Sequence, residues 1–159
     1  MHIHIDLGLQ RLSLFGDDGA CIRRYLVSTA LNGPGERRDS GCTPRGRHVV
    51  RARIGAGAPV GAVFRGRRPT GEIWTPAFAA ANPDRDWILS RIMWLSGCEP
   101  GRNRLGQVDS MRRYIYIHGT GDDQPMGVAR SHGCIRMRNR DVIELFDLVA
   151  GSVVVNIEE

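Results

Sequence analysis

The sequence predicts a mainly β domain, of the β-rich α+β class, with mostly antiparallel strands, one packed helix near the C-terminus and long loops. Three observations predict it: short runs in which apolar and polar residues alternate, turns rich in Gly and Pro between those runs, and one segment with helical spacing. A chain of 159 residues suits a single domain over 1–159, long enough to bury about two-thirds of its unfolded surface.

The N-terminal third reads as strands and turns. Residues 3–7 and 12–14 alternate apolar and polar side chains, which predicts two short strands that form a hairpin. Residues 16–19 are a strong turn signal, and an extended pattern resumes over 21–28. Residues 31–45, rich in Gly, Pro, Arg and Ser, predict a loop.

The middle of the chain combines strands with a long excursion. A strand is expected at 48–54, and two β-rich runs, 87–95 and 112–117, are expected to be central strands. Between the strands expected at 48–54 and 87–95, Gly55–Asp86 has little periodicity and predicts a long irregular segment, the excursion, with one short strand near Val63. Because loops of this length are usually functional, we hypothesise a lid over the site.

One helix is expected near the C-terminus. It begins near Asn139, interpreted as the N-cap, and stops before Gly151 at a C-terminal capping position. Residues 153–157 then predict a last strand. The apolar stripe of the helix and the carboxylates near its positive end fit this assignment: Val142, Ile143, Phe146, Val149, Asp141 and Glu144.

The charges indicate neither nucleic-acid binding nor membrane insertion. All 22 cationic residues are Arg, against 17 acidic ones, and they are scattered without a long basic run, so no specific nucleic-acid contact is expected. No apolar run is long enough to span a bilayer. The N-terminus lacks the basic and apolar pattern of a secretory signal, so a cytoplasmic location is expected, or a periplasmic one if a signal was removed.

Most cysteines and histidines are expected to have no chemical role. The four cysteines form no C-x-x-C pair, which favours reduced thiols over a metal knuckle or a redox pair. Outside the segment described next, the cysteines are expected to be small buried residues and the histidines surface or strand-edge residues: Cys21, Cys42, Cys98, His2, His4 and His48.

The chemistry-bearing residues lie within 117–137. A thiol becomes a nucleophile when it loses its proton, and a neighbouring imidazole or a positive local field lowers its pKa for that purpose. Cys134 supplies the thiol and His118 the imidazole, and the two meet if the loop between them folds back. His132 shares a face with Cys134 in an extended segment and diverges from it in a tight turn. Gly133 leaves room for substrate, and the N–H groups of Gly133 and Cys134 are candidate oxyanion donors.

A metal site is a weaker interpretation of the same residues. His118, His132 and Cys134 are all possible zinc ligands, but no fourth ligand is evident. No metal and no cofactor are therefore expected.

The segment resembles the signature of a known family. His118-Gly119-Thr120, followed by Ser131-His132-Gly133-Cys134-Ile135-Arg136-Met137, is similar to the pattern of the L,D-transpeptidases, the YkuD-type cysteine enzymes of bacterial peptidoglycan metabolism. Weaker similar blocks occur along the chain, at 10–14, 27–29, 43–46 and 112–119. The resemblance implies a YkuD-like antiparallel β-sandwich with long active-site loops.

The resemblance also implies a reaction. Cys134 is expected to attack the bond between the third residue of a tetrapeptide stem, usually diaminopimelate, and the terminal D-alanine. His118 is the expected base, oriented by the carbonyl of Gly119, while His132 and Ser131 shape the site. The implied partners are peptidoglycan stems or muropeptides; the oligomeric state is left open.

Two further residues match positions of the signature. Arg136 is implied to hold substrate and to order the catalytic loop, and an internal salt bridge that supports the loop is the structural alternative. Thr120 is also expected among the substrate contacts.

The identity of the acyl acceptor divides the family. We favour water, which makes the protein an L,D-carboxypeptidase of cell-wall recycling, because neither a signal nor a wall-binding module is visible. The alternative is a transpeptidase that forms 3-3 crosslinks or exchanges D-amino acids. A muropeptide sensor without catalysis and a nucleic-acid module are alternatives from other classes.

Overall fold

The computed structural model describes all residues, 1–159, and its main element is one curled, ten-stranded sheet. The strands follow the order β3-β2-β1-β10-β4-β7-β5-β6, with β8 joined to β7 and β9 joined to β8. The pairs are antiparallel except β1 with β10 and β8 with β9. The strands are β1 His2–Asp6, β2 Arg11–Phe15, β3 Cys21–Leu26, β4 Gly46–Ile54, β5 Ala62–Arg65, β6 Arg68–Ile73, β7 Ile88–Gly97, β8 Tyr116–Gly119, β9 Ile135–Met137 and β10 Val154–Glu158.

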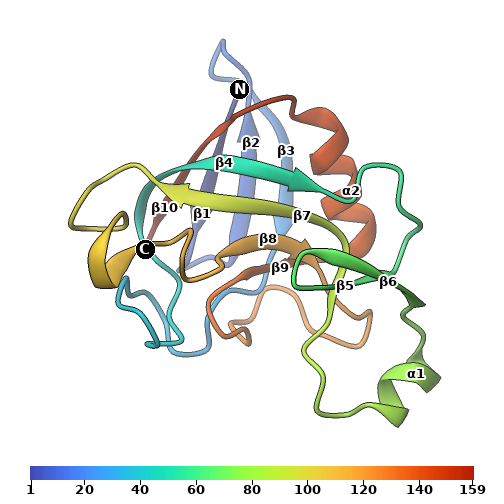
Figure 1. Cartoon of the computed structure of the whole chain (residues 1–159). Coiled ribbons are helices and arrows are strands. Elements are labelled where there is room, and N and C mark those ends of the chain that lie inside the picture. Colours follow the sequence, from blue (N-terminus) through green and yellow to red (C-terminus); the bar gives the residue numbers. More distant parts are fainter.

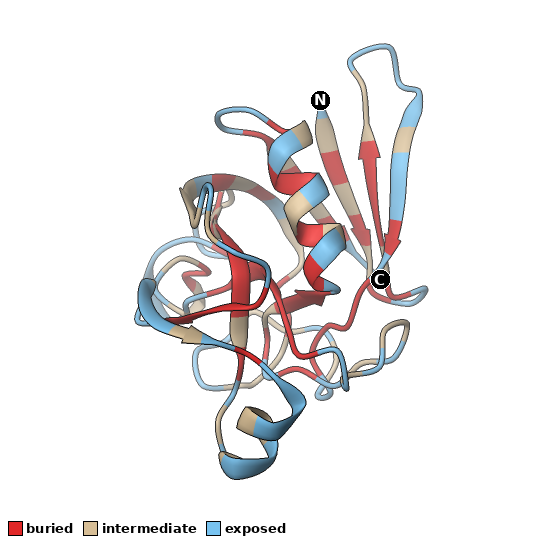
Figure 2. Cartoon of the chain, turned by 90° about the vertical axis from the view of Figure 1, so that its right-hand side faces the viewer, coloured by how far each residue is buried: buried red, intermediate tan, exposed pale blue.

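The sheet curls into two layers that enclose the core. Strands β1 to β3 cross behind β4 and β7 in Figure 1, and the helix α2, Asn139–Leu148, packs against β7 and β8. Figure 2 shows buried residues along the strands and at intervals along α2, with exposed residues between them on the helix. The main core is a cluster of 21 buried side chains that both layers and α2 share. The expected mainly β fold with one packed helix is confirmed.

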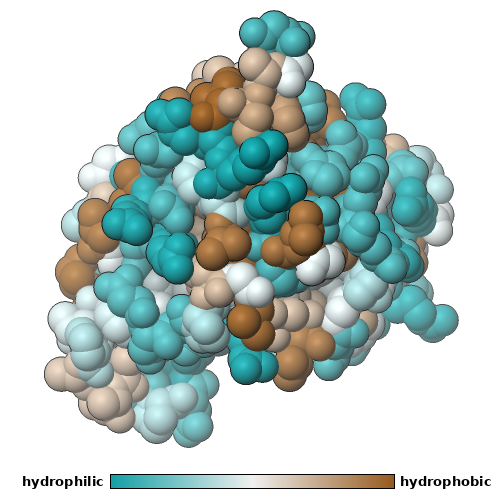
Figure 3. Space-filling view, turned by 180° about the vertical axis from the view of Figure 1, so that it is seen from behind, coloured by the Kyte–Doolittle hydropathy of each residue, from teal (hydrophilic) through white to brown (hydrophobic).

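The outside of the molecule is largely hydrophilic. Seen from behind, apolar side chains are scattered among hydrophilic ones (Figure 3). Exposed large apolar residues include Leu9, Leu26 and Leu31. Neither α-helix is long and apolar enough to cross a bilayer.

The excursion at 55–86 is more regular than the sequence indicates. It contains the hairpin β5–β6, the short helix α1 (Pro76–Ala81) and only short connecting loops. The hairpin turns at Gly66 and Arg67, both with positive φ, as a two-residue turn requires. The sequence did not predict this turn, because a non-glycine residue such as Arg67 rarely adopts a positive φ. Thr75 caps α1 by accepting the N–H of Phe78.

The strand expected at 112–117 begins later, at Tyr116. Residues before it form turns, because the Asp109 carboxylate accepts the N–H groups of Leu105 and Arg112 and Tyr114 adopts a positive φ of 58°. The apolar alternation of the sequence therefore predicted a strand where the Asp109 side chain holds the backbone in a turn.

The helix α2 is confirmed, but its expected cap is wrong. Arg138 occupies the N-cap position and Asn139 is the first helical residue. The side chain of Asn139 is buried, where it accepts from the hydroxyl of Ser90 and donates to the carbonyl of Thr120. The Asn139 side chain therefore makes tertiary hydrogen bonds and does not cap the helix.

The expected positions of the remaining cysteines and of His48 are also corrected. All four cysteines are free, but Cys21 is exposed and Cys42 and Cys98 are half-buried, so none of these three is a core residue. His48 is fully buried rather than at the surface. Its Nδ1–H donates to the Gly46 carbonyl and its Nε2 accepts from the Ser110 hydroxyl at 2.8 Å, so both ring nitrogens are satisfied.

Buried His48 makes the fold sensitive to acid. Burial lowers the pKa of His48 from 6.5 to about 4, so between these values the unfolded chain binds a proton that the folded chain does not. The stability from the neutral ring is complete above pH 6.5 and is lost as the pH falls toward 4. We expect urea unfolding to show a free energy that declines between pH 7 and 4.5, with His48 contributing about 2 kcal/mol.

The variant His48→Gln should show a shallower decline, whatever its stability at pH 7. His132→Gln, at an exposed position, is the control and should keep the wild-type decline. Equal slopes for His48→Gln and wild type would contradict the assignment.

Candidate active site

The parallel pairing of β8 with β9 places Cys134 and His118 on one face of the sheet. His118 lies opposite Arg136 in the register, and Cys134 immediately precedes β9, beside Tyr116. Because alternate residues of a strand share a face, Tyr116 and His118 point to the same side as Cys134 and Arg136. The thiol and the imidazole are therefore one diagonal step apart on neighbouring strands.

The backbone of β8 and of the turn before it holds the thiol. The Sγ–H of Cys134 donates to the carbonyl of Tyr114 at 3.2 Å, and the N–H of Tyr116 donates to Sγ at 3.3 Å. Burial raises the pKa of the Cys134 thiol to about 12, although the Tyr116 N–H and the guanidinium groups of Arg136 and Arg113 favour the thiolate. At neutral pH the thiol is protonated and needs a base in order to react.

His118 is buried and held in one tautomer. The residue is 1% exposed, and Nδ1 lies 2.6 Å from the carbonyl oxygen of Gly119. Because a carbonyl only accepts, Nδ1 carries the hydrogen and Nε2 presents its lone pair. Burial lowers the pKa of His118, against the opposing effects of the Gly119 carbonyl and the Asp86 carboxylate. The imidazole is neutral near pH 7, and the contact expected with Gly119 is present.

Gly119 is required by its surroundings. A Cβ at this position would lie 2.5 Å from Oδ1 of Asn139 and 2.6 Å from the carbonyl oxygen of Leu89. No side chain fits there without moving β7 or α2. The absence of a side chain thus lets the carbonyl that orients His118 sit against β7.

The loop before Cys134 is braced from within. The hydroxyl of Ser131 donates to the carbonyl of Cys134 at 2.6 Å and accepts the N–H of Gly133 at 3.2 Å. The hydroxyl of Thr43 donates to the carbonyl of Gly133 at 2.9 Å. Gly133 has φ 133°, and a Cβ there would lie 3.1 Å from the carbonyl of Cys42. This glycine therefore serves the close packing of the loop.

These contacts correct one expectation about the oxyanion donors. The Gly133 N–H is already bonded to Ser131, so it does not face a developing oxyanion. The N–H of Cys134 has no acceptor within the chain and remains the candidate donor.

Three residues expected to contact substrate are largely buried. Ser131, Thr120 and Arg136 are each more than nine-tenths buried. Thr120 is tied through its backbone to Met137 and Asn139, and Ser131 to its own loop. The salt-bridge alternative for Arg136 is the one observed: its Nη2 lies 3.0 Å from Oδ1 of Asp86. These three side chains therefore order the site through contacts within the protein.

Asp86 is a site residue that the sequence analysis missed. It ends the excursion before β7, and its other carboxylate oxygen lies 4.0 Å from Nδ1 of His132. His132 is 81% exposed, so the bend before Cys134 turns it outward, the second of the two expected geometries. Asp86 precedes Arg136 by 50 residues, and no local pattern marks the pair.

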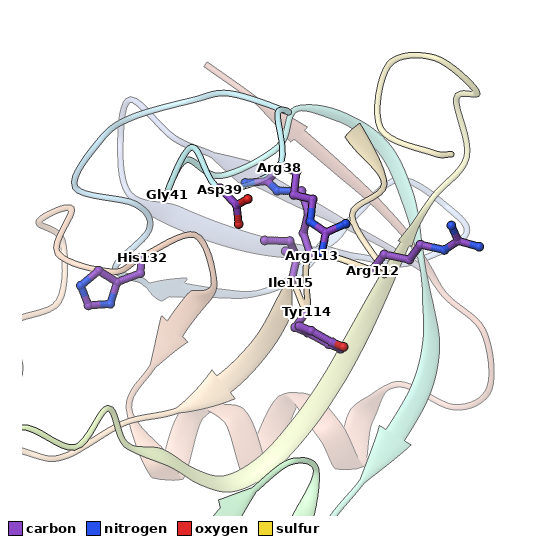
Figure 4. A pocket seen from close by; sticks show the side chains of 8 residues that line it. All are labelled: Arg38, Asp39, Gly41, Arg112, Arg113, Tyr114, Ile115 and His132. Carbon is purple, nitrogen blue, oxygen red and sulfur yellow. The ribbon is translucent and has the colours of Figure 1, made fainter. Parts of the chain in front are cut away.

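A cavity of about 380 Å³ opens between His132 and the turn at Tyr114 (Figure 4), and the carbonyl of Tyr114 is the one that accepts from the Cys134 thiol. Arg38 and Asp39 face Arg113 and Ile115 in this view, while His132 lies across from them. The remaining lining residues are Gly41, Arg112 and Tyr114.

The Arg113 guanidinium donates to the carbonyls of Glu36 and Cys42, so it fixes the loop that forms one wall of the cavity. The exposed guanidinium groups of Arg38 and Arg112 have no carboxylate partner within 4 Å. The basic lining suits an anionic ligand.

The sequence as a whole matches a known family. The sequence model of the YkuD family, described as the L,D-transpeptidase catalytic domain, matches residues 1–157. The chain therefore belongs to the L,D-transpeptidase catalytic-domain family. The relatives from Bacillus subtilis strain 168 and Bacillus licheniformis, both named as candidate L,D-transpeptidases YkuD, are each 46% identical over 46 residues, 29% of this chain and 28% of the relative.

Solved L,D-transpeptidases share the fold. The enzyme from Xylanimonas cellulosilytica is 19% identical with a TM-score of 0.55, over 98% of this chain and 59% of that one. L,D-transpeptidase 3 from Mycobacterium tuberculosis is 15% identical with a TM-score of 0.55, over 99% and 60%. LdtMt1 in complex with imipenem is 14% identical with a TM-score of 0.56, over 98% and 57%. The chain spans less than two-thirds of the length of each.

The tight environment of Gly119 predicts the effect of one added methyl group. Gly119→Ala should displace the carbonyl that orients His118, lower stability by about 2 kcal/mol through overpacking, and reduce turnover further than the lost stability explains. Chemical unfolding and steady-state kinetics measure the two effects. Gly8→Ala, where the nearest atom to a Cβ is 3.4 Å away, is the control. Wild-type stability and turnover in Gly119→Ala would contradict the described packing.

Proposed function

We propose that the chain is a cysteine-dependent acyltransferase of peptidoglycan metabolism that acts on the bond between diaminopimelate and D-alanine in tetrapeptide stems. One observation carries the proposal: a thiol and a neutral, oriented imidazole share a face of the β8–β9 pair, and the thiol contacts the carbonyl of Tyr114, a residue that lines a basic cavity. Family membership supplies the reaction class.

The first half-reaction forms a thioester. The proton of the Cys134 thiol passes to Nε2 of His118 as Sγ attacks the carbonyl carbon of the third stem residue. The Cys134 N–H donates to the resulting oxyanion. When the tetrahedral intermediate collapses, the C–N bond breaks and His118 returns the proton to the nitrogen of D-alanine, which leaves as the neutral amine. Cys134 then carries the acyl group, and His118 is neutral again.

The second half-reaction transfers the acyl group. We propose water as the acceptor, because hydrolysis needs no second peptide site. His118 takes a proton from the water that attacks the thioester, the C–S bond breaks, and His118 returns the proton to the thiolate of Cys134. The product is a tripeptide stem, and the activity is L,D-carboxypeptidation. An amine of a second stem or a D-amino acid in place of water gives the transpeptidase alternative.

The basic cavity favours this substrate class. Stem peptides carry free carboxylates, and guanidinium groups pair with carboxylates through two parallel hydrogen bonds. Arg38 and Arg112 are exposed in the lining of this cavity, and Asp39 is its one acidic residue. The proposal therefore assigns the carboxylates of the stem to this cavity.

Incubation of the purified protein with a disaccharide tetrapeptide and a D-amino acid, followed by mass spectrometry, tests the proposal. We expect loss of one D-alanine, without exchange, and a decrease of about a thousandfold or more in Cys134→Ala. Cys21→Ala, at an exposed thiol outside the site, is the matched control and should keep full turnover.

Other products distinguish the alternatives. Exchange or dimeric products would replace the hydrolytic assignment by transpeptidation, with the same nucleophile. Turnover that survives in Cys134→Ala would contradict the proposed chemistry altogether.

A further inference from the structure

Asp86 connects the excursion to the strand that carries the site. Its half-exposed carboxylate, 54% accessible, reaches from the loop before β7 to the Arg136 side chain, which is 9% exposed. The ion pair is close, at 3.0 Å, and no other carboxylate contacts Arg136. The second guanidinium nitrogen of Arg136 lies 3.5 Å from Oε1 of Gln124 and 3.4 Å from the carbonyl of Arg130.

Arg136 brings a buried positive charge to the reacting groups. It lies opposite His118 in the β8–β9 register and shares a face with Cys134. A nearby cation disfavours a protonated imidazole and favours a thiolate, so it lowers the pKa of both groups. Unopposed, Arg136 would make His118 a weaker proton acceptor.

We propose that Asp86 is a positioning residue that holds Arg136 and offsets its charge, so that Cys134 and His118 exchange their proton over a higher pH range than Arg136 alone would allow. The inference rests on the proposed function of these two residues, since it assigns Asp86 a part in their proton transfer.

None of the other charged or titratable groups around Cys134 and His118 offsets the charge of Arg136. The Arg113 guanidinium is a second cation that acts on the Cys134 thiol. The Tyr116 phenol, bonded to Arg67, stays neutral because burial raises its pKa. His132 lies on the solvent side of Asp86. Asp86 is the one carboxylate whose charge acts on both His118 and Cys134.

The variant Asp86→Asn keeps the shape of the side chain and removes its charge. The acid limb of the pH profile of kcat/KM, which reports the His118 imidazole, should move to lower pH by about half a pH unit or more, because the unopposed guanidinium lowers the pKa of His118. Asp86→Glu should keep the wild-type midpoints. The exposed Asp84 forms no ion pair in the same loop, so Asp84→Asn is the matched control.

A second measurement does not depend on turnover. The rate of alkylation by iodoacetamide, followed by intact mass as a function of pH, reports the ionisation of the Cys134 thiol. At each pH the rate should be higher in Asp86→Asn, because a larger fraction of the thiol is ionised, and should return toward the wild-type rate in the double variant with Arg136→Gln, because both charges are then absent.

Two results would overturn the inference: wild-type midpoints with only a lower maximum in Asp86→Asn, which is the effect of a purely structural residue, or an equal shift in Asp84→Asn. Absence of Cys134-dependent turnover in the wild type would instead contradict the proposed function, and the alkylation rates would still decide whether Asp86 acts on the thiol.

Discussion

The parallel pairing of β8 with β9 is the constraint on which the site depends. It places His118 opposite Arg136 and sets Cys134 beside Tyr116, whose N–H contacts the sulfur. A parallel pair needs a crossover, and residues 120–134 supply it as a loop braced by Ser131 and by the bridge between Ser28 and Arg136. The sheet, the helix and the loop therefore converge on the relative position of one sulfur and one imidazole.

Burial sets the protonation of these groups, and a few charges adjust it. Removal from water makes both the thiolate and the imidazolium costly, so the resting pair is a neutral thiol and a neutral imidazole. The charge of Arg136 favours the thiolate and that of Asp86 favours the imidazolium, so in the proposed proton transfer the ion pair between them offsets one effect with the other. The excursion that carries Asp86 thereby takes part in the electrostatics of the site.

Local patterns predicted what is local. The alternation of Ile3 and Ile5, and of Leu12 and Leu14, predicted a hairpin correctly because these four side chains are buried in the core. Gly119 and Cys134 lie within a short specific signature. The sequence could not show contacts between distant segments, such as the ion pair of Asp86, the hydrogen bonds of Asn139 that displaced it from the cap, or the burial of His48. These contacts depend on how the sheet curls, and the sequence pattern of a single segment does not predict that curvature.

The central claim is that Cys134 is the nucleophile, and acylation by a carbapenem tests it most directly, since the structural relative LdtMt1 was solved in complex with imipenem. The protein is incubated with imipenem, its intact mass is measured, and the modified peptide is mapped. The account predicts a single adduct, on Cys134 and absent from Cys134→Ala, while Cys21→Ala is still modified. An unmodified wild type, or an adduct that persists in Cys134→Ala, would contradict it.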